Sequence, residues 1–400
     1  MKIILILLSF GLFANDLSLE TAISLAIKNN PNLKIIKKNA EIKKISGIAD
    51  SLYPNPELEL ETSDFLGTKN YSGFKNSGLS LSISQEIVLM GKNNKLINFA
   101  DSQVKTITLE LKKQKINLEY KIRNIFLEIL TLKKEQDLLI KNKEISGNIL
   151  KTVENIKNSG EISQLEVIKA QIEEKNSLIE LKTNKRKIEA LKKILFIVIG
   201  DKNLKFTDIK GKLTDYINDN TDFEEVKLER LKTIDIKIKE SSYQSGLQLL
   251  KLEEANSIPN LTLKLGANRY QEFGDYSFTF AVSMPIPLFN SNKVKIKETK
   301  FELEKNKLEI KSVKLELNER LNTYEEEIKI LSEELKNLKN DILPKTKESL
   351  KLAEEGYKEG EFKYLDLLDA KKTFITIEKE YIKKLSRYSL LKLRINYLLK

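Results

Sequence analysis

Four short segments of the chain alternate between apolar and polar residues. Residues 57–61 read Glu-Leu-Glu-Leu-Glu and residues 79–84 read Leu-Ser-Leu-Ser-Ile-Ser, and the same alternation recurs near residues 261–265 and 276–284. Because successive side chains of a strand point to opposite faces, this period of two predicts two β-hairpins. We expect the four strands at about 56–66, 78–88, 260–270 and 275–286.

The alternation gives each predicted hairpin one apolar face. In the first hairpin this face carries Leu58, Leu60, Leu79, Leu81 and Ile83, while Glu and Ser occupy the other face. A soluble sheet would need a helical layer over the apolar face, whereas a membrane barrel turns it to lipid and its polar face to an aqueous lumen. Each strand spans about ten residues, which crosses a membrane when tilted and favours the barrel.

The predicted strands form two separated pairs, which are too few to close a barrel of about eight strands. Open strand edges in lipid would leave backbone groups without hydrogen-bond partners, so the barrel must be shared between copies of the chain. Two copies give a barrel of about eight strands that side chains fill, and three give about twelve strands around a pore. Lumen size therefore favours a homotrimer.

Longer apolar periods predict two very long helices, at residues 93–157 and 292–357. At 1.5 Å per residue each would be roughly 100 Å long. In the second, apolar residues recur at alternating steps of four and three, as in a coiled coil, and Pro344 should kink or loosen the helix. These positions are Leu317, Leu321, Tyr324, Ile328, Leu331, Leu335, Leu338 and Ile342.

Each long helix leads to a glycine at which we expect the chain to turn, Gly160 in one case and Gly360 in the other. Partner helices should then return over about 162–199 and 361–399. Residues 17–52 also have a helical pattern, broken at Pro31. Long helical hairpins beside a short membrane barrel predict a tunnel across the periplasm.

The chain repeats itself once, about 200 residues apart, which predicts a duplicated unit. The first repeat covers residues 15–215 and the second residues 216–400, each with an extended hairpin, a long helix, a turn and a return helix. The predicted fold class is mainly α with a small β part and an internal two-fold repeat. Matching pairs are Pro54-Asn55 with Pro259-Asn260, Gly160 with Gly360, Glu166 with Asp366, and Ala170 with Ala370.

The N-terminus has the pattern of a secretory signal peptide over residues 1–14. Lys2 precedes a run of 12 mostly apolar residues that ends at Ala14, and Asn15 and Asp16 follow. This run is shorter than the roughly 20 residues that span a bilayer. We therefore expect cleavage after Ala14 and export of the chain.

Composition narrows the chemistry. The chain has no Cys, no His and no Trp. Disulfides, thiolate nucleophiles and the commonest metal ligand and general base are therefore absent, and we predict no catalytic residue, no metal site and no cofactor. The net charge is +11, but Lys is mixed with Glu throughout, which indicates solvated helix faces rather than a nucleic-acid groove.

Three segments resemble the TolC-like outer-membrane efflux family, and the resemblance extends over essentially all of residues 15–400. Tyr357-x-x-Gly360 with the following Leu365 to Ala370 is similar to the tip motif of the family's second repeat. Residues 84–92, ending in Gly-Lys, and residues 283–290 are similar to segments of its heavy-metal branch. Known members have an arginine where this chain has Phe362.

This resemblance implies a homotrimer in the outer membrane that extends into the periplasm, with a 12-stranded barrel and a tunnel of 12 helices. It also implies a periplasmic adaptor (membrane fusion protein) and an inner-membrane pump of the RND type as partners. The implied activity is passive efflux through a duct, with heavy-metal cations as substrate. Multidrug efflux and type I secretion remain open as alternatives.

The resemblance also points to residues at the tunnel mouth. Asp366 and Asp369 open the return helix where family members carry acidic rings, and Glu166 is the matching residue of the first repeat. Rings of carboxylates at a constriction select cations, while the simpler reading is that both aspartates stabilise the start of a helix. Expected adaptor contacts at the helical tips are Ser159, Gly160, Tyr357 and Gly360.

Two other classes of protein remain open at this stage. One is a periplasmic coiled-coil scaffold or adaptor, which would be soluble without detergent. The other is an outer-membrane enzyme that uses paired carboxylates in a pocket.

Overall fold

The computed structural model describes most of the chain as two compact units. It covers residues 16–158, 162–201, 204, 206–216 and 232–400. The predicted signal peptide, residues 1–14, lies outside the described residues, as do Ser159 and Gly160 of the first predicted turn.

One unit, here called the sheet unit, consists of Lys34–Lys112 and Ile234–Lys314. The other, the hairpin unit, consists of the described residues within Met1–Leu33, Lys113–Thr233 and Leu315–Lys400. Each unit takes segments from both predicted repeats.

The order of elements follows the predicted duplication: helix, two strands, long helix and return helix, twice. The first series is α2 (Pro31–Asp50), β1 (Glu57–Ser63), β2 (Gly78–Ile87), α3 (Lys92–Asn158) and α4 (Gln164–Ile199). The second is α6 (Ile234–Asn256), β3 (Leu261–Tyr270), β4 (Tyr276–Ser283), α7 (Lys293–Asn337), α8 (Leu343–Lys358) and α9 (Tyr364–Leu399). Shorter elements are α1 (Leu19–Asn29), the 3-10 turns Lys69–Tyr71 and Leu213–Tyr216, and a π-helical turn at Leu338–Ile342.

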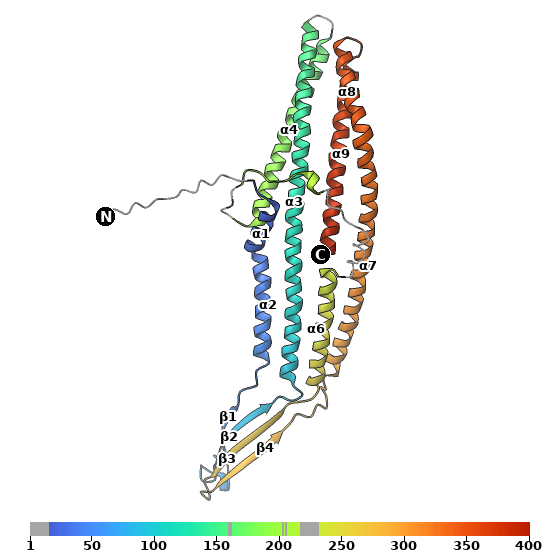
Figure 1. Ribbon diagram of the computed structural model, residues 1–400. Coiled ribbons are helices and arrows are strands. Elements are labelled where there is room, and N and C mark those ends of the chain that lie inside the picture. The colour runs from blue at the N-terminus through green and yellow to red at the C-terminus, as the bar shows by residue number, and fades with distance from the viewer. Residues whose placement is uncertain (1–15, 159–161, 202–203, 205, 217–231) are drawn as a thin grey trace, which may run out of the picture. The chain divides into compact units, whose positions relative to one another are not determined.

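The four strands form a single antiparallel sheet in the order β1-β2-β3-β4 (Figure 1). The predicted hairpins are confirmed, but the expectation of two separated pairs is wrong, because β2 pairs with β3 over ten residue pairs from Gly78↔Tyr270 to Ile87↔Leu261. Local alternation shows where strands are, whereas this pairing joins residues nearly 200 positions apart. The sheet thus unites the two repeats.

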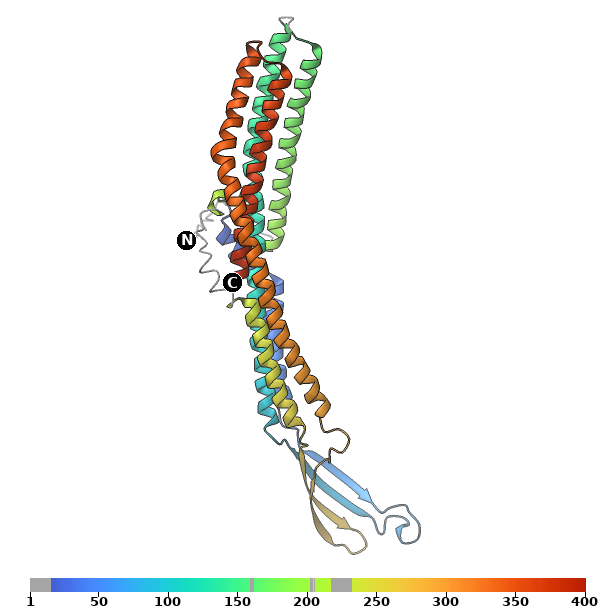
Figure 2. The same ribbon diagram turned by 90° about the vertical axis from the view of Figure 1, so that its right-hand side faces the viewer.

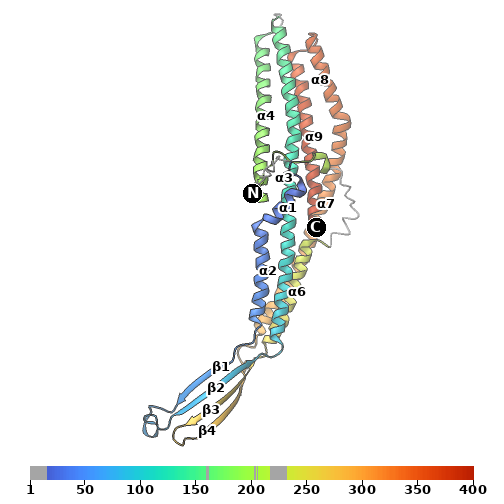
Figure 3. The ribbon, with the colours of Figure 1, turned by 60° about the vertical axis from the view of Figure 1, so that its left-hand side comes forward.

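In the sheet unit the helices follow the same order as the strands they adjoin, α2-α3-α6-α7 (Figures 1 and 3). A Cβ added at Gly47 of α2 would lie 2.2 Å from the Cβ of Ala100 of α3, so these two helices touch through their backbones. Ser102 Oγ of α3 lies 3.0 Å from Ser245 Oγ of α6. Lys239 of α6 and Glu309 of α7 form an ion pair of 2.7 Å.

In the hairpin unit, α9 lies between the α3–α4 hairpin and the helices α7 and α8 (Figure 2). Glu327 of α7 accepts two hydrogen bonds from Arg387 of α9, of 2.6 and 2.9 Å, and Thr131 of α3 donates to Ser386 of α9 at 2.9 Å. Near the tip, α9 shares a buried apolar core with α3, α4 and α8. It includes Val153, Val167, Leu350, Tyr357, Leu367 and Phe374.

The predicted loosening before Pro344 is confirmed as the π-helical turn between α7 and α8. A proline has no N–H and its ring crowds the carbonyl four residues earlier, and a wider turn accommodates both. The coiled-coil positions from Leu317 to Leu338 face the interior, but the expectation for Ile342 is wrong because its side chain is exposed. The π turn shifts the helical phase, and burial resumes at Leu350.

Candidate functional site

The turn between α8 and α9 is built around two glycines. Gly360 has a φ of +79°, a left-handed conformation that glycine adopts without strain, and this confirms the predicted turn. The Gly356 carbonyl accepts hydrogen bonds from the backbone N–H groups of Glu361 and Phe362, at 2.8 and 3.2 Å. A Cβ at Gly356 would lie 2.4 Å from the Phe362 ring, so the absent side chain lets this ring close over the helix end.

Asp366 and Asp369 lie three residues apart in the first turns of α9, and both side chains are exposed. The Asp366 carboxylate accepts a hydrogen bond of 2.9 Å from the backbone N–H of Lys363, the residue that caps the helix. This contact satisfies one of the free N–H groups at a helix start. Asp366 therefore caps α9, and its exposed carboxylate remains available to solvent.

Glu166 occupies the same place in α4 as Asp366 does in α9, three residues after the capping residue Ser163. Its surroundings differ, because Glu166 is half-buried and accepts a hydrogen bond of 3.4 Å from the hydroxyl of Tyr357 on α8. The structure thus brings together a residue predicted at the aperture and one predicted at the adaptor contact. Glu166 contributes to the contact between the two hairpins rather than to an exposed surface like that of Asp366.

Two tyrosine hydroxyls lie in this contact. Burial, and then the nearby Glu166 carboxylate, raise the pKa of Tyr357 to about 12. Burial, and then the charges of Glu173 and Glu166, raise the pKa of Tyr364 to about 12. Both phenols therefore stay protonated at neutral pH, and Tyr357 donates to the carboxylate.

The apolar face of the sheet is open to its surroundings. The register places Leu60 opposite Leu81, Leu81 opposite Ala267, and Ala267 opposite Phe278, so one apolar face runs across all four strands. Phe278 is 89% exposed, and Leu58, Leu60, Leu265 and Phe280 are also exposed. In the described part of the sheet unit no helix covers this face, which disagrees with the soluble sheet that needs a helical layer.

The opposite face of the sheet is polar. Glu59 of β1 accepts a hydrogen bond of 3.3 Å from Ser82 of β2 and forms an ion pair with Lys264 of β3. On β4, Thr279 accepts from Asn268 of β3 at 2.8 Å. Polar contacts between neighbouring strands thus occupy the face opposite the bare apolar one, as expected where one face meets water and the other lipid.

Sequence reasoning missed a buried charge between the hairpins. Lys371 of α9 is 3% exposed, and its ammonium contacts Ser146 of α3 and Glu173 of α4. A signal was present, because Tyr364, Leu367, Lys371 and Phe374 are spaced by three, four and three residues, which puts the lysine at a core position.

Two features are absent from the part of the chain that the structure describes. None of the helices there combines the length and the apolar character that crossing a membrane requires. The same residues contain no group of three or more Asp, Glu, His or Cys side chains placed to hold a metal ion.

The chain is similar in sequence to known efflux and metal-resistance proteins. Residues 234–390 match the family model described as outer membrane efflux protein. The chain is 22% identical over 369 residues to the cobalt-zinc-cadmium resistance protein CzcC of Cupriavidus metallidurans, covering 92% of this chain and 86% of that protein.

Solved structures share the fold over nearly the whole chain. A crystal structure of CusC, described for its folding and transmembrane channel formation, has a TM-score of 0.79 at 13% identity and covers 96% of this chain and 92% of its own. The outer membrane protein VceC of Vibrio cholerae has a TM-score of 0.76 at 15% identity, covering 95% of both chains. The long helical hairpins and the four-stranded sheet are therefore a fold seen in outer-membrane channels.

Proposed function

Because the chain belongs to the outer membrane efflux protein family, we propose that it forms the outer-membrane duct of a three-part efflux system. The bare apolar face of its four-stranded sheet, which includes the exposed Phe278 on β4, carries this proposal. Burying apolar area in lipid stabilises such a face, whereas exposing it to water would favour aggregation. The duct is a passive conduit, and the energy for transport comes from a pump in the inner membrane.

The sheet needs further copies of the chain to function in a membrane. Strands β1 and β4 each have one paired neighbour, so each leaves one edge open. Backbone groups at an open edge in lipid cost several kcal/mol each, and about eight strands are the fewest that close a barrel. Three copies supply about twelve strands and a water-filled lumen lined by the polar face.

The helices of the sheet unit have matching open edges. On α2, Ile35 and Ile42 are spaced seven residues apart, and on α7, Phe301 and Leu308 have the same spacing. All four side chains are more than half exposed. A seven-residue apolar spacing is the pattern of a helix that packs lengthwise against another.

The two apolar stripes also match in height above the sheet. Ile42 lies eight residues before the end of α2 at Asp50, and Phe301 lies eight residues after the start of α7 at Lys293. Ile35 and Leu308 are each fifteen residues from the same ends. The α7–β4 edge of one copy therefore fits the α2–β1 edge of the next, and such a head-to-tail contact closes into a ring.

A passive outer-membrane duct needs partner proteins that supply the energy for transport. We propose a periplasmic adaptor, a membrane fusion protein, that meets the helical tips near Gly360 and Tyr357, and an inner-membrane pump of the RND type. Heavy-metal cations are the proposed substrate, supported by the similarity to a cobalt-zinc-cadmium resistance protein. Multidrug efflux is the second candidate, because the matched family model, outer membrane efflux protein, names no substrate.

Cross-linking of engineered cysteines tests the assembly, because the natural chain contains none. The Ile42→Cys, Phe301→Cys double variant, purified in detergent and oxidised, should give covalent dimers and trimers on denaturing gels. Each single variant should remain monomeric. Dimers from Phe301→Cys alone would show a symmetric contact and contradict the ring. Ion conductance of the untreated protein in planar bilayers tests the duct itself, and absence of conductance by intact trimers would contradict it.

A further inference from the structure

A positive charge is buried in the core between the two helical hairpins. Lys371 of α9 lies among apolar neighbours on its own helix, with Leu367 and Phe374 buried on either side. The Lys371 residue is 3% exposed, and burial lowers the pKa of its ammonium group, which the nearby Glu173 partly offsets.

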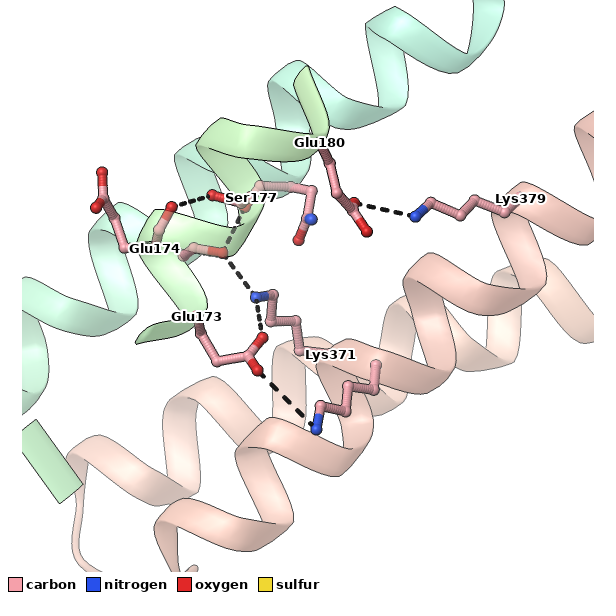
Figure 4. Close-up of polar contacts among 9 residues, drawn as sticks. Glu173, Glu174, Ser177, Glu180, Lys371 and Lys379 are labelled. Carbon is pink, nitrogen blue, oxygen red and sulfur yellow. Dashed lines mark hydrogen bonds and ion pairs between the residues drawn. The ribbon is translucent and has the colours of Figure 1, made fainter. Parts of the chain in front are cut away.

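Three helices hold this ammonium (Figure 4). Its Nζ donates a hydrogen bond of 2.6 Å to Ser146 Oγ of α3 and lies 3.4 Å from Glu173 Oε2 of α4. Ser146 in turn donates to the backbone carbonyl of Asn142 at 2.8 Å. The other oxygen of Glu173 lies 4.0 Å from Nζ of Lys372, whose side chain is exposed. The contact therefore joins α9 of the second repeat to both helices of the first-repeat hairpin.

Stability alone is a poor explanation for this arrangement. Taking an ammonium out of water is expensive, and one ion pair of 3.4 Å repays only part of the desolvation. An apolar side chain of similar volume at such a position is often as stable or more stable. A single polar residue at a coiled-coil core position is instead known to fix the register of the helices.

The residues one helical turn away from Glu173 and Ser146 show which sliding movement of the helices the buried charge opposes. One turn from Glu173 along α4, the residues are Lys169, Ala170, Asn176 and Ser177. One turn from Ser146 along α3, they are Asn142, Lys143, Ile149 and Leu150. None of these is acidic, so a shift of one turn in either direction would move the buried ammonium away from its carboxylate.

Three acidic residues of α4 contact the α8–α9 hairpin, and they follow one another at the seven-residue spacing: Glu166, Glu173 and Glu180. The other acidic residues of α4, Glu174 and Glu189, lie outside this row. Glu166 accepts a hydrogen bond from the hydroxyl of Tyr357. Glu180 forms an ion pair of 3.0 Å with Lys379 of α9 (Figure 4). The contact between hairpins thus has one alignment in which every carboxylate of this row meets its partner.

We propose that Lys371, Glu173 and Ser146 form a register lock that holds the α8–α9 hairpin at a single axial position against the α3–α4 hairpin. One-turn displacement of packed helices is a recognised way for proteins to change state. The lock disfavours this displacement between the hairpins, and it does so independently of whether the chain conducts ions.

Cysteine pairs in the otherwise cysteine-free chain report the alignment. The in-register pair replaces Glu180 and Lys379, whose side chains touch, and the shifted pair replaces Thr183 and Lys379, one turn further along α4. With a short thiol-to-thiol cross-linker, the native core should favour the in-register pair by about tenfold or more, since a shift strands a buried charge. In the Lys371→Met background this ratio should fall at least about threefold.

Lys372→Met is the matched control. It removes the exposed neighbouring lysine that also faces Glu173, and it should leave the cross-linking ratio unchanged. Thermal melting provides the second measurement: Glu173→Gln strands the buried ammonium and should lower Tm, whereas Lys371→Met should keep Tm or raise it. An unchanged ratio in Lys371→Met overturns the lock. A fall in Tm for Lys371→Met as large as for Glu173→Gln also overturns it, because the pair would then serve stability.

If Lys371→Met fails to fold, the double variant Lys371→Met, Glu173→Gln takes the place of the single variant in the cross-linking test. The double variant removes both charges of the buried pair at once. The lock predicts the same fall in the ratio for this double variant, and retention of the native ratio contradicts it.

Discussion

The hydroxyl of Tyr357 on α8 donates a hydrogen bond to the carboxylate of Glu166 on α4, 3.4 Å away. The bond joins the last turn of the second-repeat helix to the first turn of the first-repeat return helix. It lies beside the turn at Gly360, where the α8–α9 hairpin ends. The strength of this bond therefore bears on how firmly α8 and α4 are held together.

The pair predicts a loss of stability at alkaline pH. The pKa of Tyr357 is about 12 in the folded chain and near 10 when unfolded, so the unfolded chain releases its proton first. Stability from this group is complete below pH 10 and is lost as the pH rises toward 12, by up to about 2 kcal/mol for a well-buried phenol. Tyr357→Phe should flatten this part of the pH profile, measured by chemical denaturation between pH 9 and 12 relative to the native chain.

Tyr388→Phe is a suitable control, because the Tyr388 ring lies on α9 and contacts Lys392 rather than a carboxylate. Its profile should follow that of the native chain. If Tyr357→Phe loses stability above pH 10 as steeply as the native chain does, the phenol is not held neutral by the contact.

Long-range pairings mark the limit of what the sequence could predict. The alternation at Leu58 to Leu60 and the seven-residue spacing from Leu317 to Leu331 depend on neighbouring residues, and both were predicted correctly. The pairing of β2 with β3 and the bond from Tyr357 to Glu166 join residues nearly 200 positions apart. No local pattern specifies such partners.

The sequence reasoning placed two side chains, Ile342 and Lys371, in the wrong environment, and the structure shows the local cause of each error. Ile342 leaves the interior because the π turn before Pro344 rotates the helix, and sequence spacing assumes a constant turn. Lys371 occupies a core position by spacing, but composition favoured reading every lysine as solvated. A charged residue in register with apolar ones was the signal of a buried contact.

The bare sheet face predicts that a lysine is far more destabilising at one position of β4 than at the next. Phe278→Lys places a charge on the apolar face and should cost about 2–4 kcal/mol near the membrane midplane, whereas Thr279→Lys places it on the polar face and should cost little. Recovery of heat-resistant oligomer from the membrane fraction measures the effect. Equal recovery of the two variants would show that this sheet does not cross a membrane.

Close helix contact in the sheet unit predicts the effect of adding one methyl group. Gly47→Ala brings its Cβ within 2.2 Å of the Ala100 Cβ, which cannot rotate away, and should destabilise the unit by about 1–3 kcal/mol. Gly246→Ala, in the second repeat, meets the flexible end of Leu303 at 2.8 Å and the Asn306 side chain at 3.6 Å, and should cost less.

Gly147→Ala of α3 is the control for this series. No atom lies within 4 Å of its added Cβ, and alanine in a helix is favoured over glycine by about 0.5–1 kcal/mol. The expected order of Tm is therefore Gly147→Ala, Gly246→Ala and Gly47→Ala, from highest to lowest. A Gly47→Ala variant as stable as Gly147→Ala would contradict the backbone contact of α2 with α3.

The final prediction concerns the two exposed aspartates of α9. In a trimer, Asp366 and Asp369 would place up to six carboxylates around one axis, and such rings favour cations. Asp366→Asn with Asp369→Asn removes these charges, while an asparagine at 366 can still accept the hydrogen bond from the Lys363 N–H. We expect assembled trimers with weaker cation preference and weaker block by divalent ions in planar-bilayer recordings. Helix stability should change by less than about 1 kcal/mol.

A control double variant shows whether the effect depends on where the carboxylates lie or only on the loss of two negative charges. Glu333→Gln with Glu348→Gln also removes two exposed carboxylates from the hairpin unit, but away from the start of α9. If the aspartates act at an aperture, this control should keep the native selectivity and block, since a ring acts on ions only at the constriction where it lies. If the aspartates only begin the helix, both double variants should conduct like the native chain. Unchanged selectivity and block in the aspartate variant would therefore remove the aperture role and leave Asp366 as a helix cap alone.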